Sequence, residues 1–276
     1  MPKTFFLFGY LMPAFVVVLI LISALFHASW NALLHRSEDP SMSIVVSYLS
    51  FGVFLSPALI IDPPTEVIGW ALLSGLFHAV YITMLSFGYQ IGSLGIVYPI
   101  SRGVAPLLVA LGGWVILNET PSMSTTLGLF LLTSGLMLIA VLAKNIKETR
   151  AVMIAFVTGV STVGYSLIDA HAVDFTGALG YLSLLVLIGS SVVLMARRPP
   201  FFELRKNAVN GIIVGVLQGA AYALILLAFQ RAQAGQVAGL RQVSVIFGTL
   251  IAREALGRRA LSGSFLVALG AALVIW

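Results

Sequence analysis

Polar and aromatic side chains that could bind a small solute recur at helical spacing inside two apolar segments. Ser74, His78 and Tyr81 follow one another at intervals of four and three residues, and Gln218 and Tyr222 are four residues apart in a later segment. These intervals place side chains on one face of an α-helix. Because polar groups are costly in an apolar environment, we expect His78, Tyr81, Gln218 and Tyr222 to face a cavity and bind substrate. Hydrogen bonding between packed helices is the alternative.

Two further stretches add candidate substrate-binding residues. His27 and Asn31 are four residues apart with Trp30 beside them, although His27 could instead bond to a neighbouring helix and Trp30 could anchor the chain at a membrane surface. Tyr98 and Ser101 flank a proline, which permits a kinked or unwound backbone that faces a cavity. Another segment carries polar groups at similar spacing: Thr158, Thr162 and Tyr165.

Two arginines stand inside apolar segments rather than between them. Arg102 and Arg241 could each hold a carboxylate through two parallel hydrogen bonds, with Gln242 beside the second. Pairing at a gate is the competing interpretation for all three residues. We expect both arginines to lie nearer the non-cytoplasmic mouth than the centre of the membrane.

The acidic residues are placed differently from the arginines. All ten lie in loops or within about a turn of a segment end, and we expect Asp169 and His171 to belong to a helix end in water. Intramembrane carboxylates are the usual proton relays, so this distribution favours a passive facilitator over a proton-coupled pump, although His78 could relay protons. We find no metal-binding, phosphate-binding or catalytic-triad motif and no cysteine, and we therefore expect no enzyme activity, cofactor or metal.

The composition indicates that membrane helices position these residues. Hydrophobic residues make up 59% of the 276 positions and charged residues 9%, whereas soluble domains are about a quarter charged. Apolar runs of about 20 residues can cross a bilayer as helices, and these runs lack the alternation of barrel strands. We predict an all-α integral membrane protein with ten transmembrane helices. They cover residues 11–34, 42–61, 66–90, 94–118, 122–143, 150–170, 175–196, 207–231, 235–256 and 259–276.

The basic residues predict the orientation. The net charge of +5 follows from short loops rather than a basic face, so we expect no nucleic-acid partner. Two basic residues, Lys3 and Arg231, lie on one side, and eleven lie in the odd-numbered loops, which this excess places in the cytoplasm, with both termini outside. We expect a bacterial-type inner membrane, and the first segment is too long for a cleavable signal. The eleven are Arg36, Lys144, Lys147, Arg150, Arg197, Arg198, Arg205, Lys206, Arg253, Arg258 and Arg259.

The two halves of the sequence resemble each other. Arg102 and Arg241 are 139 positions apart, as are Glu119 and Arg258. Chance similarity between apolar segments is the alternative to duplication. Five helices in each half, residues 1–144 and 145–276, would run in opposite orientations and enclose a mid-membrane substrate site. The second and seventh segments suggest only generic lipid-facing or packing helices.

Three stretches resemble the EamA-type drug/metabolite transporter superfamily, and most closely its aromatic amino acid exporter (YddG-like) group. They are residues 26–34 (FHASWNALL), 98–119 (YPISRGVAPLLVALGGWVILNE) and 240–247 (LRQVSVIF). The chain departs from the pattern at Arg258, where the first half has Glu119. The resemblance implies a ten-helix inverted-repeat carrier that exports amino acids or other metabolites by alternating access.

The substrate is not determined by these features alone. We expect small amphipathic metabolites, with aromatic amino acids favoured because His78, Tyr81 and Tyr98 could stack on a ring. A multidrug or cationic-compound antiporter and a sugar-phosphate-type exchanger are the alternatives. Substrate and membrane lipid are the only expected partners, and the sequence leaves monomer and dimer undetermined.

Overall fold

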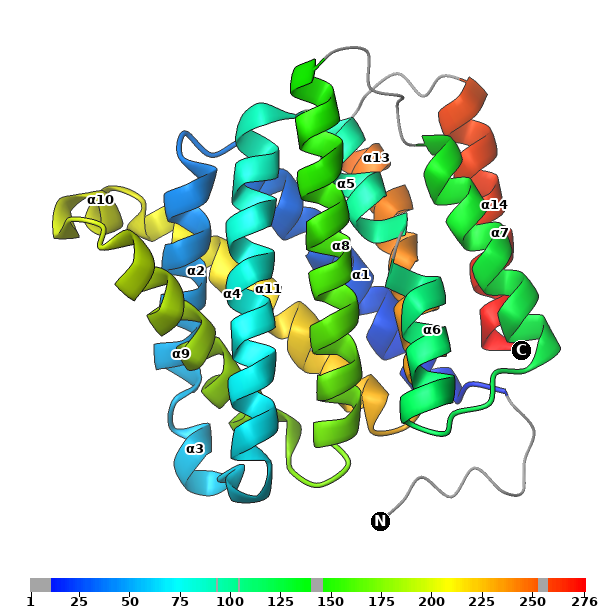
Figure 1. Ribbon diagram of the computed structural model, residues 1–276, viewed down its shortest axis with the longest axis horizontal. Helices are drawn as coiled ribbons and strands as arrows, with labels where there is room; N and C mark the ends of the chain where they lie inside the picture. The colour runs from blue at the N-terminus through cyan, green and yellow to red at the C-terminus, as the bar shows by residue number, and fades with distance from the viewer. Residues whose placement is uncertain (1–10, 93, 104, 140–145, 253–257) are drawn as a thin grey trace.

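The computed structural model describes residues 11–92, 94–103, 105–139, 146–252 and 258–276, and within these ranges the chain is helical without a strand (Figure 1). Six stretches are long and apolar enough to cross a membrane, which is consistent with a membrane protein. They are Ala14–His35, Thr65–Ile91, Val97–Ile116, Thr149–Ala172, Ala178–Arg197 and Ala208–Phe229. Three apolar helical stretches are shorter: Pro40–Leu55, Met123–Ile139 and Leu261–Ile275.

Each of the ten predicted segments coincides with one or more helices. The single helices are α1 (Ala14–His35), α2 (Pro40–Leu55), α4 (Ile68–Ile91), α7 (Met123–Ile139), α8 (Ile146–Ala172), α9 (Ala178–Arg197), α11 (Ala208–Phe229) and α14 (Arg258–Ile275). Three short elements join them: α3 (Ala58–Ile61), η1 (Thr65–Val67) and α10 (Phe201–Lys206).

One predicted segment changes its winding along its length, and another is described as two helices on either side of residue 104. The fourth consists of α5 (Leu94–Gly103), which contains Pro99, and α6 (Ala105–Ile116). The ninth consists of α12 (Ala234–Leu240), the single 3-10 turn η2 (Arg241–Val243) and α13 (Ser244–Ala252). Arg241 therefore lies where the helix changes its winding, a geometry often found at functional sites.

Local chemistry explains several helix ends. Asp39 caps α2 by accepting a hydrogen bond from the Met42 backbone N–H at 2.9 Å, and Pro40 occupies the first turn. The predicted segment 42–61 is not one helix, because α2 ends at Leu55 and the chain turns at Pro57 before α3. Arg198 ends α9 in the left-handed conformation, with a φ of 45°.

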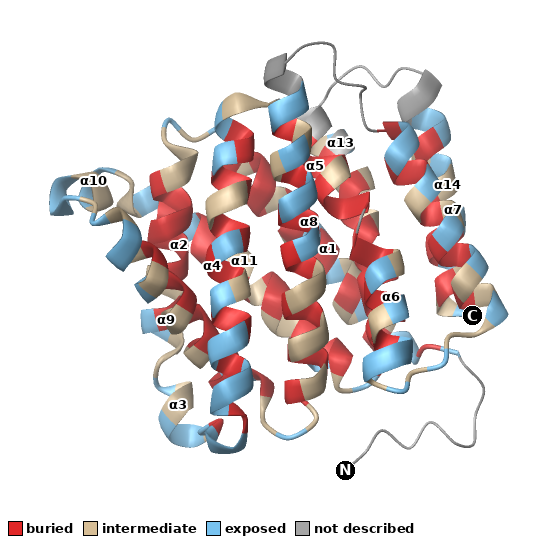
Figure 2. Ribbon diagram, viewed as in Figure 1, coloured by how far each residue is buried: buried red, intermediate tan, exposed pale blue. Residues whose placement is uncertain are grey.

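Helices from the two halves of the chain pack against one another. The most extensive pairs are α7 with α14, α4 with α8, α1 with α11 and α2 with α11, and α9 packs against both α4 and α2 (Figure 1). Buried residues gather on the inward faces of these helices (Figure 2). On α4, Ser74 and His78 are buried while Leu72, Leu73 and Leu76 are exposed, so the outer surface is apolar as lipid requires.

The α7–α14 pair depends on glycine. A Cβ on Gly128 would lie 2.6 Å from the Gly270 carbonyl oxygen, and a Cβ on Gly135 would lie 2.6 Å from the Gly263 carbonyl oxygen. Both distances are too short for a side chain. Small residues of this kind allow backbones to approach closely in membranes.

Some predictions fall outside the described residues. Lys3, Lys144 and Arg253 lie there, as do the side chains of Lys147, Arg258 and Arg259 and the proposed boundary at residues 144–145. The orientation of the termini therefore remains a prediction from the sequence.

Candidate functional site

Six helices and the η2 turn line a partly open cavity, whose empty space together with the adjoining open solvent is ≈ 430 Å³. Its walls come from α1, α2, α4, α8, α9, α11 and η2, so both halves of the sequence contribute. Its lining residues are His27, Trp30, Ser47, Tyr48, Phe51, His78, Tyr81, Tyr165, Leu182, Val186, Gly215, Gln218, Gly219, Tyr222 and Arg241.

The structure brings together seven of the twelve predicted site residues. They are His27, Trp30, His78, Tyr81, Gln218, Tyr222 and Arg241. The other five do not line the cavity: Asn31, Tyr98, Ser101, Arg102 and Gln242. Helical spacing found the correct face of α4 and α11 because both helices keep their polar face turned inward.

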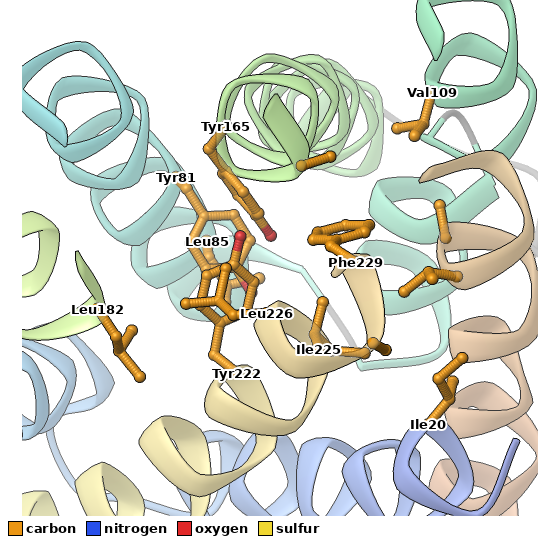
Figure 3. Close-up of a cluster of buried hydrophobic side chains, with 14 of the residues drawn as sticks. Ile20, Tyr81, Leu85, Val109, Tyr165, Leu182, Tyr222, Ile225, Leu226 and Phe229 are labelled. Carbon is orange, nitrogen blue, oxygen red and sulfur yellow. The ribbon is translucent and has the colours of Figure 1, made fainter. Parts of the chain in front are cut away.

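Three tyrosines and a histidine form one wall, which we call the aromatic cluster: His78, Tyr81, Tyr165 and Tyr222. The His78 ring stacks on Tyr165 with centroids 4.1 Å apart and meets the edge of Tyr222 at 5.3 Å. Tyr81 and Tyr222 each meet Tyr165 edge-on at 5.6 Å. Figure 3 shows the three tyrosine rings close together, each from a different helix. Such a cluster offers ring edges, faces and hydroxyls to an aromatic guest.

A backbone contact orients His78 within this cluster. Its Nδ1 lies 3.0 Å from the Ser74 carbonyl oxygen, and because a carbonyl only accepts, Nδ1 carries the proton. Nε2 is then the unprotonated acceptor of a neutral imidazole. His78 therefore presents an acceptor to a bound N–H or O–H group.

Next to the aromatic cluster is the arginine cluster: His27 and Arg241, which line the cavity, and Arg102, which contacts His27. The guanidinium of Arg102 contacts His27 Nε2, and Nη2 of Arg241 lies 3.4 Å from His27 Nδ1. Trp30 donates its indole N–H to the same Nδ1 at 3.2 Å. A neutral imidazole can accept at one nitrogen only, so donors facing both nitrogens are incompletely satisfied.

Neither guanidinium forms an ion pair with a carboxylate among the described residues. Arg102 and Arg241 are 3% and 5% exposed, and no carboxylate within the described ranges lies at ion-pairing distance from either. The Nε of Arg241 also has no hydrogen-bond partner. Buried cations are normally paired, so this corner of the cavity is electrostatically suited to an anion.

Arg241 lies in the wall of the same cavity as His78. Its guanidinium carbon lies 5.4 Å from the centre of the Tyr222 ring. The residue belongs to the 3-10 turn at residues 241–243, which the apolar pattern of the segment does not reveal. The expectation that both arginines lie nearer the non-cytoplasmic mouth than the membrane centre stays a prediction.

Asp169 is not in water, as the sequence suggested. It lies near the end of α8, yet it is fully buried because α9 and α11 cover it. Its Oδ1 accepts a hydrogen bond from the Tyr181 hydroxyl at 2.6 Å, and its Oδ2 accepts one from the Tyr222 hydroxyl. His171 is half-buried against Trp70, with ring centroids 5.1 Å apart.

The predicted residues outside the lining support the arginine cluster. Tyr98 stacks on His27 with ring centroids 6.1 Å apart, and Ser101 donates to the Tyr98 carbonyl. Asn31 donates to the His27 carbonyl at 2.8 Å and accepts from a tyrosine on α4. Gln242 of η2 donates to the Ala238 carbonyl in the preceding helix α12. These contacts hold the backbone around the site rather than the solute.

The second and seventh segments pack against other helices, as expected, but they also contribute to the cavity wall. Ser47, Tyr48 and Phe51 of α2 and Leu182 and Val186 of α9 all line the cavity. Ser47 donates to Gln218 Oε1 at 2.9 Å, linking α2 to α11. The four-residue spacing of Ser43 and Ser47, both fully buried, was the signal available in the sequence.

Comparison with known proteins adds the fold alone. No family model matches the chain, and no curated protein matches it in sequence. A solved structure described as "Crystal structure of protein" is similar with a TM-score of 0.74 and 13% identity, over 94% of this chain and 96% of its own. The similarity spans both halves of the molecule and names no activity.

Proposed function

We propose that this chain is a membrane transporter that exports small amphipathic metabolites bearing a carboxylate, with aromatic amino acids the favoured class. The observation that carries the proposal is a pair of buried arginines, neither of them ion-paired with a carboxylate in the described part of the chain, beside a cavity walled with aromatic rings. The resemblance of residues 98–119 to the EamA-type superfamily, and to its aromatic amino acid exporters, agrees with it. The membrane would be a bacterial-type inner membrane.

The arginine cluster and the aromatic cluster would bind different parts of the substrate. A substrate carboxylate beside His27 would accept from Arg241 and complete its hydrogen bonding, since guanidinium groups match carboxylates in geometry. An aromatic side chain would lie against the aromatic cluster, where edge and face contacts are favourable. The substrate hydroxyl or ammonium could then meet His78 Nε2 and the tyrosine oxygens.

Alternating access would follow from two inverted five-helix halves. If α1, α2, α4, α7 correspond to α8, α9, α11, α14, exchanging the halves converts the α4–α8 contact into α11–α1 and leaves α2–α9 and α7–α14 unchanged. All of these pairs are among the observed helix contacts. Helix α5 and the η2 turn carry Arg102 and Arg241 at corresponding places. This exchange symmetry supports the proposed duplication and a site that the halves can expose alternately.

The alternatives fare differently against the same cavity. Two buried guanidiniums would repel a cationic drug, which argues against a cation antiporter even though Asp169 is buried. A sugar-phosphate-type exchanger is the second candidate, because Arg241 lies in the cavity wall where a phosphate could reach it. The aromatic cluster favours a ring-bearing substrate over a sugar phosphate.

Counterflow into proteoliposomes tests the proposal. Vesicles loaded with unlabelled phenylalanine should take up labelled phenylalanine, and a panel of other amino acids, a quaternary ammonium dye and a sugar phosphate should compete less well. His78→Ala and Tyr81→Ala should each reduce exchange by about tenfold or more, because each removes ring contacts and a polar partner worth about 1.5 kcal/mol together. Phe202→Ala, an exposed aromatic on α10, is the matched control. Absence of amino acid exchange, or exchange unchanged in both cavity variants, contradicts the proposal.

A further inference from the structure

Asp169 is a buried carboxylate without a cationic partner. It is fully buried, and no cation within the described part of the chain lies at ion-pairing distance. Both oxygens instead accept hydrogen bonds from neutral hydroxyls, Oδ1 from Tyr181 and Oδ2 from Tyr222. A lone intramembrane carboxylate is expensive, and such groups commonly serve in proton transfer.

Tyr222 connects this carboxylate to the substrate cavity. Its ring lines the cavity, while its hydroxyl donates to Asp169 behind the wall. Ser74 provides a second connection, because its hydroxyl interacts with Asp169 and lies 3.3 Å from Nδ1 of the cavity residue His78. Asp169 itself does not line the cavity, so any interaction between Asp169 and a bound substrate passes through Tyr222 or Ser74.

The Tyr222 hydroxyl changes direction when Asp169 gains a proton on Oδ2, the oxygen to which Tyr222 donates. With Asp169 ionised, the hydroxyl proton points to Oδ2, and the oxygen lone pairs remain available to an N–H group in the cavity. A proton on Oδ2 makes the acid the donor, so Tyr222 becomes its acceptor and turns its own proton elsewhere. The ionised state therefore favours a substrate ammonium, and the protonated state disfavours it.

The arginine cluster fixes which end of an amino acid meets Tyr222. The substrate carboxylate is drawn to Arg241 and Arg102 at the His27 wall, so the ammonium lies toward the aromatic cluster and Asp169. The positive end then faces the carboxylate only while that carboxylate is ionised. Binding of the substrate therefore disfavours protonation of Asp169, and protonation of Asp169 weakens substrate binding.

We infer that Asp169 is a proton-binding site linked by Tyr222 to the cavity, and that the carrier exchanges one proton for one amino acid. The exchange transfers a proton between water and Asp169, with no covalent step. This inference rests on the proposed function. It replaces the passive facilitator that the acidic residues suggested from sequence.

Other ionisable groups surround Asp169 without pairing with it. On its own helix lie Tyr165 and His171, from α4 comes His78, and Arg241 of η2 lies across the Tyr222 ring. Tyr98 and Arg102 of α5 turn toward His27. Asp169 is the carboxylate that bonds to a cavity residue among the described residues, and it is therefore the group to test.

Gradient-driven accumulation in proteoliposomes tests the inference. Labelled phenylalanine is offered to vesicles that are acidic inside, with the membrane potential clamped by potassium and valinomycin and with protein-free vesicles as the leak control. A gradient of about one pH unit should support up to about tenfold accumulation by the wild-type chain, because one pH unit is a tenfold ratio of proton activity. Asp169→Asn should abolish accumulation, and the counterflow without a gradient should be weaker than in the wild type, because the neutral side chain no longer faces the substrate ammonium with a negative charge. Tyr181→Phe should retain accumulation, and Glu38→Gln, an exposed carboxylate, is the matched control.

A second measurement does not depend on a folded Asp169 variant. Wild-type protein in detergent and weak buffer, mixed with phenylalanine over a pH series, should release up to about one proton per molecule bound, since binding and protonation are linked. Release of no proton at any pH overturns the inference.

The outcomes separate the two proposals. Counterflow that ignores the gradient, or an Asp169→Asn variant that still accumulates substrate, refutes proton coupling at this site and leaves the proposed function standing. No counterflow with any amino acid refutes the proposed function, and the inference falls with it.

Discussion

Arg241 and Asp169 are both buried and both contact the Tyr222 side chain, but their charges are balanced in different ways. Asp169 receives hydroxyl donors on both oxygens, whereas Arg241 has an Nε without a partner and an imidazole that it shares with Arg102. A buried charge whose hydrogen bonds are all made within the protein can remain buried and exchange a proton. A buried charge that lacks hydrogen-bond partners is suited to bind a ligand. The comparison shows that one cavity can combine a group proposed to bind the ligand, Arg241, with a group proposed to take up a proton, Asp169. Tyr222 contacts both.

The largest expected effect comes from removing the arginine that is proposed to bind the substrate carboxylate. Arg241→Ala should reduce amino acid counterflow about ten- to a hundredfold, because hydrogen bonds to charged groups contribute about 1.5–3 kcal/mol and each 1.4 kcal/mol is about tenfold. Initial exchange rates at several substrate concentrations measure the loss. The exposed Arg231→Ala is the control and should be neutral. Equal rates in the two variants would show that the arginine cluster does not hold the substrate.

A smaller effect distinguishes the two tyrosine hydroxyls that donate hydrogen bonds to Asp169. Tyr222→Phe and Tyr181→Phe each remove one donor to a buried carboxylate, so each should lower the free energy of unfolding by about 1–3 kcal/mol. Thermal denaturation in detergent measures both. Only Tyr222→Phe should also weaken phenylalanine binding, because only Tyr222 lines the cavity. Equal binding losses in both variants would mean that Asp169 affects the cavity through packing.

The smallest effect concerns the hydrogen bond that links α2 to α11 in the cavity wall. Ser47→Ala removes the 2.9 Å hydrogen bond to Gln218 and should cost about 0.5–1.5 kcal/mol of stability, with an exchange rate within about threefold of wild type. Ser56→Ala removes a hydroxyl that bonds only within its own turn and serves as the control. A collapse of transport in Ser47→Ala would instead place α2 among the elements that contact substrate directly.

The sequence predicted some parts of this site and missed others for identifiable reasons. The spacing of His78 and Tyr81 was sufficient, because a helix of this length has one polar face and that face turns inward. Asp169 was misplaced because nearness to a helix end was taken as exposure, and only the cover provided by Tyr181 and Tyr222 removes it from water. Tyr48 and Phe51 were missed because residues of these types are as common in packing as in a cavity wall.

By itself, the sequence determined the helical segments, because apolar length and backbone hydrogen bonding within lipid leave a helix as the available structure for such runs. It also determined which faces are polar, since that follows from periodicity within one helix. Only the tertiary structure decided that Arg102 and Arg241 meet at one histidine and that Asp169 lies behind Tyr222. Those meetings depend on how helices far apart in the chain cross one another, which side-chain packing between the two halves sets and no local pattern encodes.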